Sequence, residues 1–477
     1  MTGREDTMSL KDTVRSWIVN LLDLNDLADT ATRNRIERLA ELRDYYDGIH
    51  KQQLRVKPGK FNDNLTINLV GLIVDKAVSA LVGDPADGHG LRWEFPSETT
   101  IDKKTKKKVY SPSKAITWLD EQWEANGRDS FLHKNAMSGA ASGFPAIKLV
   151  PDGDGNIRLI NLNPLLLDVN TDPQDSEKVT AYVIRYIVTE NDRQVAYKEE
   201  TKPTNPDSET SSWTIETRRH VSGKHWELTT PPVLWMYPFP PILVWQNLPA
   251  TDSPYGRSDI EGIIPIQDRY NFLVSNLSKI IRLYAHPQRF ARNLTAQLVD
   301  GQVVMGPDEM PSYTGDGDIV QLPSVGDLPG AMLFLQSLRE SAFLLSREVD
   351  SMSMKDKVGA ITNFALRVLY RDFLDKLGTK RMLYGAAYQE LNRRILALGN
   401  YEPETCDIYW PDPLPVNEVE EIAAIKGDME LGLVSVQTAR EIRNYDHEQE
   451  TERMSAEKVG ADNAGALLLQ NFFAKGQ

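Results

Sequence analysis

The fold is decided by residues 331–398, which read AMLFLQSLRESAFLLSREVDSMSMKDKVGAITNFALRVLYRDFLDKLGTKRMLYGAAYQELNRRILAL. In the first part, apolar residues recur at helical spacing until Asp350. Twelve residues with little periodicity follow, DSMSMKDKVGAI, ending at Ile361. The helical pattern then resumes and continues to Leu398. We therefore expect two helices joined by a basic loop.

The second of these helices is unusually long. At 1.5 Å per residue, residues 362–398 would form a helix of roughly 55 Å, more than an ordinary domain needs. Gly378 and Gly385 lie inside it and are the expected bending points.

Another helix is expected upstream, over residues 265–284. Ser258 and Glu261 have the spacing of a capping box, and Pro265 suits the first position of a helix. We expect one face of this helix to pack and another, with polar residues such as Gln267 and Asn271, to be solvated. Residues 285–329 are divided by Pro and Gly and are too long for a simple connection, so they predict a small separate module.

The N-terminal half mixes helical and strand patterns. Helices are predicted at residues 34–47, 66–82, 115–125 and 129–142, and strands at 146–150, 157–162, 179–188 and 213–217. A strand at residues 406–410 and acidic helices over 416–458 close the chain. The predicted fold class is α+β, mainly helical.

Composition narrows the functional classes. The 477 residues suggest about three domains of ~150 residues. A single cysteine, Cys406, excludes an intrachain disulfide and fits assembly in a reducing cytoplasm. No secretory signal and no apolar run of bilayer-spanning length occurs, so no membrane partner is expected. The net charge of −14 repels nucleic acid on average.

Motifs for catalysis and metal binding are missing from the sequence. There is no GxxxxGK[ST] phosphate loop, HExxH or GxSxG. Residues 152–156, DGDGN, match the start of an EF-hand loop, but Ile157 replaces the required glycine and Asn163 the bidentate glutamate. A hairpin turn explains them better. We expect no catalytic residue, no metal site and no cofactor.

Several segments, in this order, resemble the portal (head-tail connector) family of tailed bacteriophages, in its large Gp6-like branch. The segments are Tyr45–Gly48, Asn68–Val70 through Val82–Pro85, Tyr255–Gly262, Gly359–Thr362, Trp410–Pro415, Leu431–Ser435 with Thr438, and Asp446–Glu450. Each segment alone is weakly specific, but together they span most of the chain.

The resemblance implies a dodecameric ring at one capsid vertex, through which double-stranded DNA is packaged and ejected. It also implies these parts: a wing at residues 1–257, a stem helix at 258–284, a clip at 285–329, a second stem helix at 330–349, a tunnel loop at 350–361, a long kinked wing helix at 362–399, a returning wing strand at 400–415 and a crown at 416–477. The implied partners are the major capsid protein, the terminase and a head-tail adaptor. The implied location is the virion, after assembly in the host cytoplasm.

Charge by region suggests how DNA would be handled. Residues 350–399 hold nine Lys and Arg against five acids, whereas residues 402–457 hold fifteen acids against four bases. A channel that neutralised many phosphates would hold DNA too tightly to move it, so weak, non-specific contacts are expected. The candidate channel residues are Arg347, Met352, Met354, Lys355, Lys357, Arg367 and Arg371. The alternative for Lys355 and Lys357 is that they are solvated loop charges without contact to DNA.

Two other classes of protein are considered. A terminase motor-nuclease is disfavoured because the phosphate loop is missing. A virion shell component or adaptor without a DNA channel is the main alternative, and a closed ring with a central hole would distinguish the portal from it.

Overall fold

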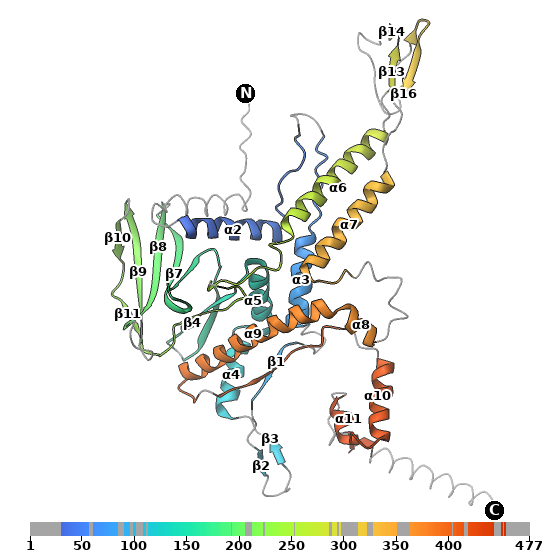
Figure 1. Cartoon of the computed structure of the whole chain (residues 1–477). Helices are drawn as coiled ribbons and strands as arrows, with labels where there is room; N and C mark the ends of the chain where they lie inside the picture. The colour runs from blue at the N-terminus through green and yellow to red at the C-terminus, as the bar shows by residue number, and fades with distance from the viewer. Residues whose placement is uncertain are drawn as a thin grey trace, which may run out of the picture. The chain divides into compact units, whose positions relative to one another are not determined.

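The computed structural model describes residues 30–454 with gaps (Figure 1). The gaps are residues 57–60, 84–89, 96–98, 102–107, 111–112, 154, 192, 206–211, 223–224, 252, 286–288, 293–294, 297–312, 322–327, 351–362, 403, 415–417, 443–449 and 452. The chain divides into two compact units: Met1–Lys355 with Tyr370–Pro413, and Asp356–Leu369 with Leu414–Gln477. Each unit is described by itself.

The first unit contains the four predicted N-terminal helices. They are α2 (Thr30–Tyr46), α3 (Leu69–Val82), α4 (Lys114–Ala125) and α5 (Arg128–Ser142). Asn68 caps α3, because its side chain accepts a hydrogen bond from the Gly71 amide. Ser113 caps α4 by accepting one from the Ile116 amide. These helices confirm the periodicity-based prediction.

Two antiparallel sheets lie in the same unit. A three-stranded sheet has the order β12-β4-β5, and a six-stranded sheet has the order β10-β9-β8-β7-β6, with β11 also paired to β9. The strands are β4 (Ala146–Pro151), β5 (Ile157–Asn161), β6 (Leu167–Asp172), β7 (Asp175–Glu190), β8 (Arg193–Pro203), β9 (Trp213–Ser222), β10 (His225–Leu228), β11 (Val233–Trp235) and β12 (Ile242–Val244). The predicted turn at residues 152–156 joins β4 to β5, and Asn156 donates its amide to Asp152 Oδ1 over 2.8 Å.

Short strands complete this unit. β2 (Thr99–Ile101) and β3 (Lys108–Tyr110) pair as a short antiparallel hairpin. β1 (Arg92–Glu94) does not belong to it and pairs instead with β17 (Asp407–Tyr409), the predicted C-terminal strand. Between α6 (Ile264–Ala285) and α7 (Leu328–Ser346) in the sequence, β13 (Arg289–Arg292) pairs with β16 (Asp318–Gln321), and β14 (Thr295–Ala296) pairs with β15 (Tyr313–Thr314).

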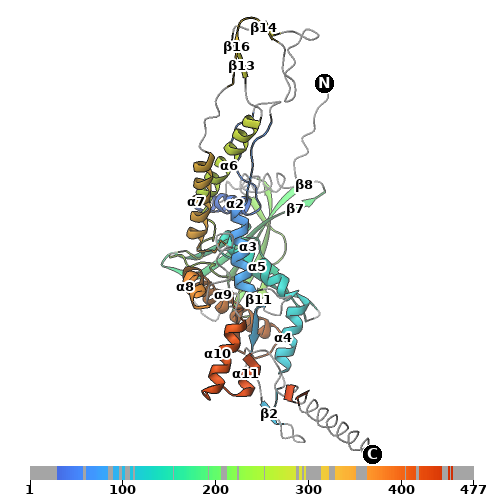
Figure 2. The same cartoon turned by 90° about the vertical axis from the view of Figure 1, so that its right-hand side faces the viewer.

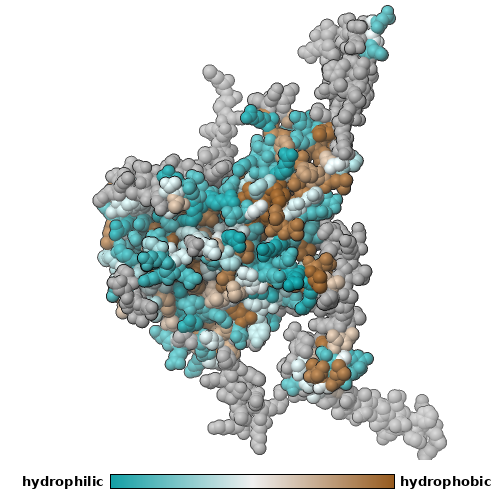
Figure 3. Space-filling view, viewed as in Figure 1, coloured by the Kyte–Doolittle hydropathy of each residue, from teal (hydrophilic) through white to brown (hydrophobic). Residues whose placement is uncertain are grey.

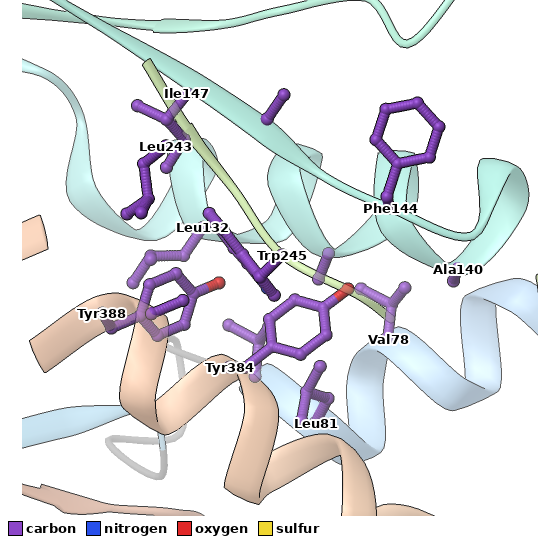
Figure 4. Packing of buried hydrophobic residues seen from close by; sticks show 14 of the residues in the cluster. Val78, Leu81, Leu132, Ala140, Phe144, Ile147, Leu243, Trp245, Tyr384 and Tyr388 are labelled. Carbon is purple, nitrogen blue, oxygen red and sulfur yellow. The ribbon is translucent and has the colours of Figure 1, made fainter. Parts of the chain in front are cut away.

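The core gathers around α9 (Arg371–Leu398). Figure 4 shows Tyr384 and Tyr388 pointing from this helix toward Trp245 and Leu132. Both tyrosine rings meet the Trp245 indole edge-on, with centroids 5.6 and 5.7 Å away. Helix α9 is therefore the element on which α3, α5 and the three-stranded sheet converge.

Helices α6 (Ile264–Ala285) and α7 (Leu328–Ser346) lie side by side in both views (Figures 1 and 2). The bounds of α6 confirm the helix predicted at residues 265–284. The predicted capping box is wrong. Residues 259–263 form turns before the helix, and the Ser258 hydroxyl donates to the carbonyl oxygens of α5 instead of capping α6.

The predicted long helix is interrupted, but not at a glycine. It consists of α8 (Asn363–Leu369) and α9, separated at Tyr370, whose backbone (φ −96°, ψ 12°) is non-helical. The two helices fall into different compact units. Gly378 and Gly385 lie inside continuous α9. A glycine permits a helix to bend but does not force it to.

The described part of the second unit is helical. Besides α8, it contains α10 (Glu418–Glu430) and α11 (Val436–Ile442), within the predicted acidic region. In the parts of both units that the structure describes, no helix has the length and apolar character needed to cross a membrane.

Candidate functional site

The predicted channel residues are only partly covered by the structure. Met352, Met354, Lys355 and Lys357 lie outside the described residues. Arg347 follows α7 directly, is exposed and has a left-handed backbone (φ 55°), which ends the helix earlier than the predicted position 349.

Arg367 and Arg371 are both exposed. Arg371 lies 3.9 Å from Asp375 in an exposed ion pair. Arg367 belongs to α8 and the second unit, whereas Arg347 and Arg371 belong to the first.

A buried cluster of four charges lies where α6 begins and α7 ends. Lys376 Nζ is 2.9 Å from Asp259 Oδ1 and 2.8 Å from Glu348 Oε1. Lys380 pairs with the other oxygen of Asp259. All four side chains are at most 5% exposed. With two ammonium groups and two carboxylates the cluster is neutral, which is how buried charges are tolerated.

The surroundings shift the pKa values of this cluster in different directions. Burial alone would raise the pKa of Asp259, but the two lysines outweigh it and hold that pKa below its ordinary value. Burial raises the pKa of Glu348, and the neighbouring Lys376 offsets this rise only in part. The pKa of Lys376 is raised because its two carboxylates outweigh burial, whereas burial lowers the pKa of Lys380.

The chain between Ser346 and Asp350 is held by further cations. Lys76 of α3 donates a 2.7 Å hydrogen bond to the Val349 carbonyl oxygen. Arg339 of α7 binds both oxygens of Asp350, at 2.7 and 3.0 Å. The backbone that precedes residues 351–362 is thus fixed from α3, α7 and α9.

Helix α6 packs with its polar side, contrary to expectation. Gln267, Asn271 and Ser275 are at most 1% exposed. They accept hydrogen bonds of 2.9 to 3.0 Å from the alternate backbone amides of residues 69, 67 and 65. The polar face predicted to be wet is therefore buried, because the extended chain before α3 needs partners for its amides.

The apolar sides of α6 and α7 are left partly uncovered within the single chain. Figure 3 shows hydrophobic residues gathered over these two helices. On α7 only part of the predicted apolar stripe is buried, notably Ala342. The most exposed large apolar residues here are Ile281 (58%), Met332 (66%), Leu333 (67%), Phe334 (47%), Leu344 (72%) and Leu345 (61%). A contiguous surface of this kind typically marks an interaction site.

The structure also corrects the charge count of residues 350–399. Lys376, Lys380 and Arg394 are buried. The two lysines pair with the Asp259 carboxylate, and Arg394 donates a hydrogen bond to a backbone carbonyl oxygen. They are not available to phosphates. Among the described residues no group of three or more His, Cys, Asp or Glu is placed to hold a metal ion.

Sequence reasoning missed the buried cluster, although one signal was present. Lys376 and Lys380 are four residues apart and fall on the same stripe of α9 as the buried Phe373 and Tyr384. Lysines within an apolar helical stripe must either reach solvent or meet buried carboxylates. Asp259 and Glu348, far away in the sequence, supply those carboxylates.

Comparison with known proteins gives one family match. The sequence model described as "Phage portal protein, SPP1 Gp6-like" matches residues 28–464. No curated protein sequence matches the chain. Among solved structures, a chain described as "Virion of native gene transfer agent (GTA) particle" matches with a TM-score of 0.42 and 16% sequence identity, over 86% of this chain and 93% of that chain.

Proposed function

The chain belongs to the SPP1 Gp6-like family of phage portal proteins, and on that premise we propose that it forms a dodecameric ring at one capsid vertex. Double-stranded DNA passes through the centre of this ring during packaging and ejection. The family is one of structural virion proteins, so the protein's task is to shape a passage while another protein supplies the motor.

One observation carries the proposal. Helix α6 uses its polar residues Gln267, Asn271 and Ser275 inside the subunit, and α6 and α7 leave apolar residues uncovered. A lone subunit would expose this surface to water. In a ring, each subunit presents two different complementary faces to its neighbours, and such a face would be covered on closure. An obligate interface of this kind buries more than ~2,000 Å².

Charge supports weak, non-specific handling of DNA. The whole chain carries −14, so phosphates are repelled on average. Attraction then comes from a few basic positions, for which we propose Arg347, Lys355, Lys357, Arg367 and Arg371. Met352 and Met354 complete the proposed channel residues as an adaptable apolar surface. Few basic contacts on a repulsive background allow DNA to slide.

The proposed parts follow the family plan. α6 and α7 form the stem, residues 285–329 the clip, residues 350–361 the tunnel loop and residues 416–477 the crown. The clip meets the terminase and later the head-tail adaptor, and the wing meets the major capsid protein. Rings assemble in the host cytoplasm and act in the virion.

Imaging of the purified chain tests this function. Negative-stain electron microscopy and native mass measurement should give closed rings with a central hole. Shells or monomers at micromolar concentration would instead support a virion component without a channel.

A further inference from the structure

The segment Ser346–Asp350 is anchored through its backbone as well as through the side chains of Glu348 and Asp350. Lys376 donates a 2.8 Å hydrogen bond to the Ser346 carbonyl oxygen, and Lys76 donates one of 2.7 Å to that of Val349. Ser346 ends α7, so its carbonyl would otherwise lack an intrahelical partner, and a cation there also complements the helix dipole. The position of this backbone is thus set by cations from two other helices.

The same lysine connects this segment to the start of α6. Lys376 bridges Glu348 and Asp259. The Asp259 amide donates 2.9 Å to the Ala140 carbonyl oxygen on α5, and Asn247 Nδ2 lies 3.4 Å from Asp259 Oδ2. The chain before α6 and the chain after α7 are therefore tied to α9 at a single point.

Stability alone does not account for such a cluster. Desolvating four charged groups costs much of what their attraction returns, and apolar replacements of buried ion pairs are often neutral or stabilising. Their geometric effect is different, because an ammonium group between two carboxylates has few satisfactory positions. The cluster thus restricts where the backbone can lie more than it adds to the free energy of unfolding.

We infer that Asp259, Glu348, Lys376 and Lys380 form a positioning anchor that fixes the chain immediately before residues 351–362 to α9. The inference rests on the proposed function, in that those residues form the tunnel loop. With the anchor in place, the backbone from Ser346 to Asp350 keeps its position against α9. Without it, the end of α7 loses that restraint.

The decisive variant is the neutral pair Lys376→Met with Glu348→Gln, which leaves Asp259 and Lys380 balanced. Assembled full-length protein without DNA is compared with wild type by hydrogen exchange at the Arg347 and Glu348 amides, which bond to Leu344 and Phe343 oxygens over 3.1 and 3.0 Å. Exchange should accelerate at least about tenfold, while the unfolding midpoint stays close to wild type. DNA retention should fall. Wild-type exchange in this variant would overturn the inference.

Two further variants complete the test. Lys76→Met releases the Val349 carbonyl and removes the cation that lies over the Phe343 ring, so it should also accelerate exchange and remains informative if the pair does not fold. Arg393→Met, at an exposed position of α9, should change neither exchange nor DNA retention. If wild-type rings themselves retain no DNA, the proposed function fails, whereas the exchange comparison still decides the anchor.

Discussion

Trp123 and Asn392 are joined by a 2.8 Å hydrogen bond from the indole Nε1 to the amide Oδ1, across 269 residues of sequence. Neither residue is exposed to solvent. The Asn392 amide nitrogen lies a further 3.4 Å from Cys406 Sγ. One buried amide thus connects α4, α9 and the chain before β17.

Replacing Asn392 with Ala should therefore destabilise the first unit. The substitution leaves the indole N–H of Trp123 buried without an acceptor, which costs about 1–3 kcal/mol. Urea unfolding followed by tryptophan fluorescence measures the loss. Arg393→Ala, on the exposed side of the same helix, is the control and should change the free energy of unfolding by less than about 0.5 kcal/mol. Equal losses in both variants would contradict the assignment.

Local sequence signals predicted the elements well, because they depend on near neighbours. The helix predicted at residues 66–82, observed as α3, and the turn at residues 152–156 are examples. The break at Tyr370 was not predicted, since the two glycines nearby are the stronger local signals and the break coincides with a boundary between compact units.

The candidate site was harder to predict. Apolar spacing on α6 reveals an amphipathic helix, but not which face its own subunit covers. The buried face is polar because the backbone amides of residues 65–69 require hydrogen-bond partners. These residues are far from α6 in the sequence, so the spacing of residues within α6 does not reveal this contact. Likewise, a charge count from the sequence includes Lys376 and Lys380 among the charges available to DNA. The structure shows that Asp259 and Glu348, which are far away in the sequence, pair with them.

Changing Leu344 and Leu345 to Glu should prevent assembly without unfolding the subunit. The two side chains are 72% and 61% exposed in the single chain, so the subunit loses little packing. Across a subunit interface, buried unpaired carboxylates would cost several kcal/mol. Sedimentation velocity should show monomers in place of rings, with unchanged circular dichroism. Met382→Glu, on the exposed side of α9, should assemble normally, and rings formed by the Leu344 and Leu345 variant would exclude this face from the interface.

The stability of the first unit should depend on pH through Glu348. Burial raises its pKa above the ordinary value of 4.5, so between these two values the folded chain keeps a proton that the unfolded chain has lost. This group's contribution to stability is therefore present at low pH and is lost as the pH rises, with a slope of at most about 1.4 kcal/mol per pH unit. Glu348→Gln should remove that slope. Urea midpoints measured from pH 4.5 upward test it, and parallel curves for the two proteins would refute the assignment.

Charge reversal of Lys355 and Lys357 to Glu should leave rings intact but impair DNA packaging or retention. The two residues open the most basic stretch of the C-terminal half, and the structure removes Lys376, Lys380 and Arg394 from the charges available there. The loop lysines consequently carry a larger share of any attraction to phosphate. Retention should weaken with rising salt in the wild type and depend less on salt in the variant, by a slope of about one per lost phosphate contact. Lys426→Glu, at an exposed position of α10, is the matched control. Packaging at the wild-type level by the double variant would mean that both lysines are plain solvated charges.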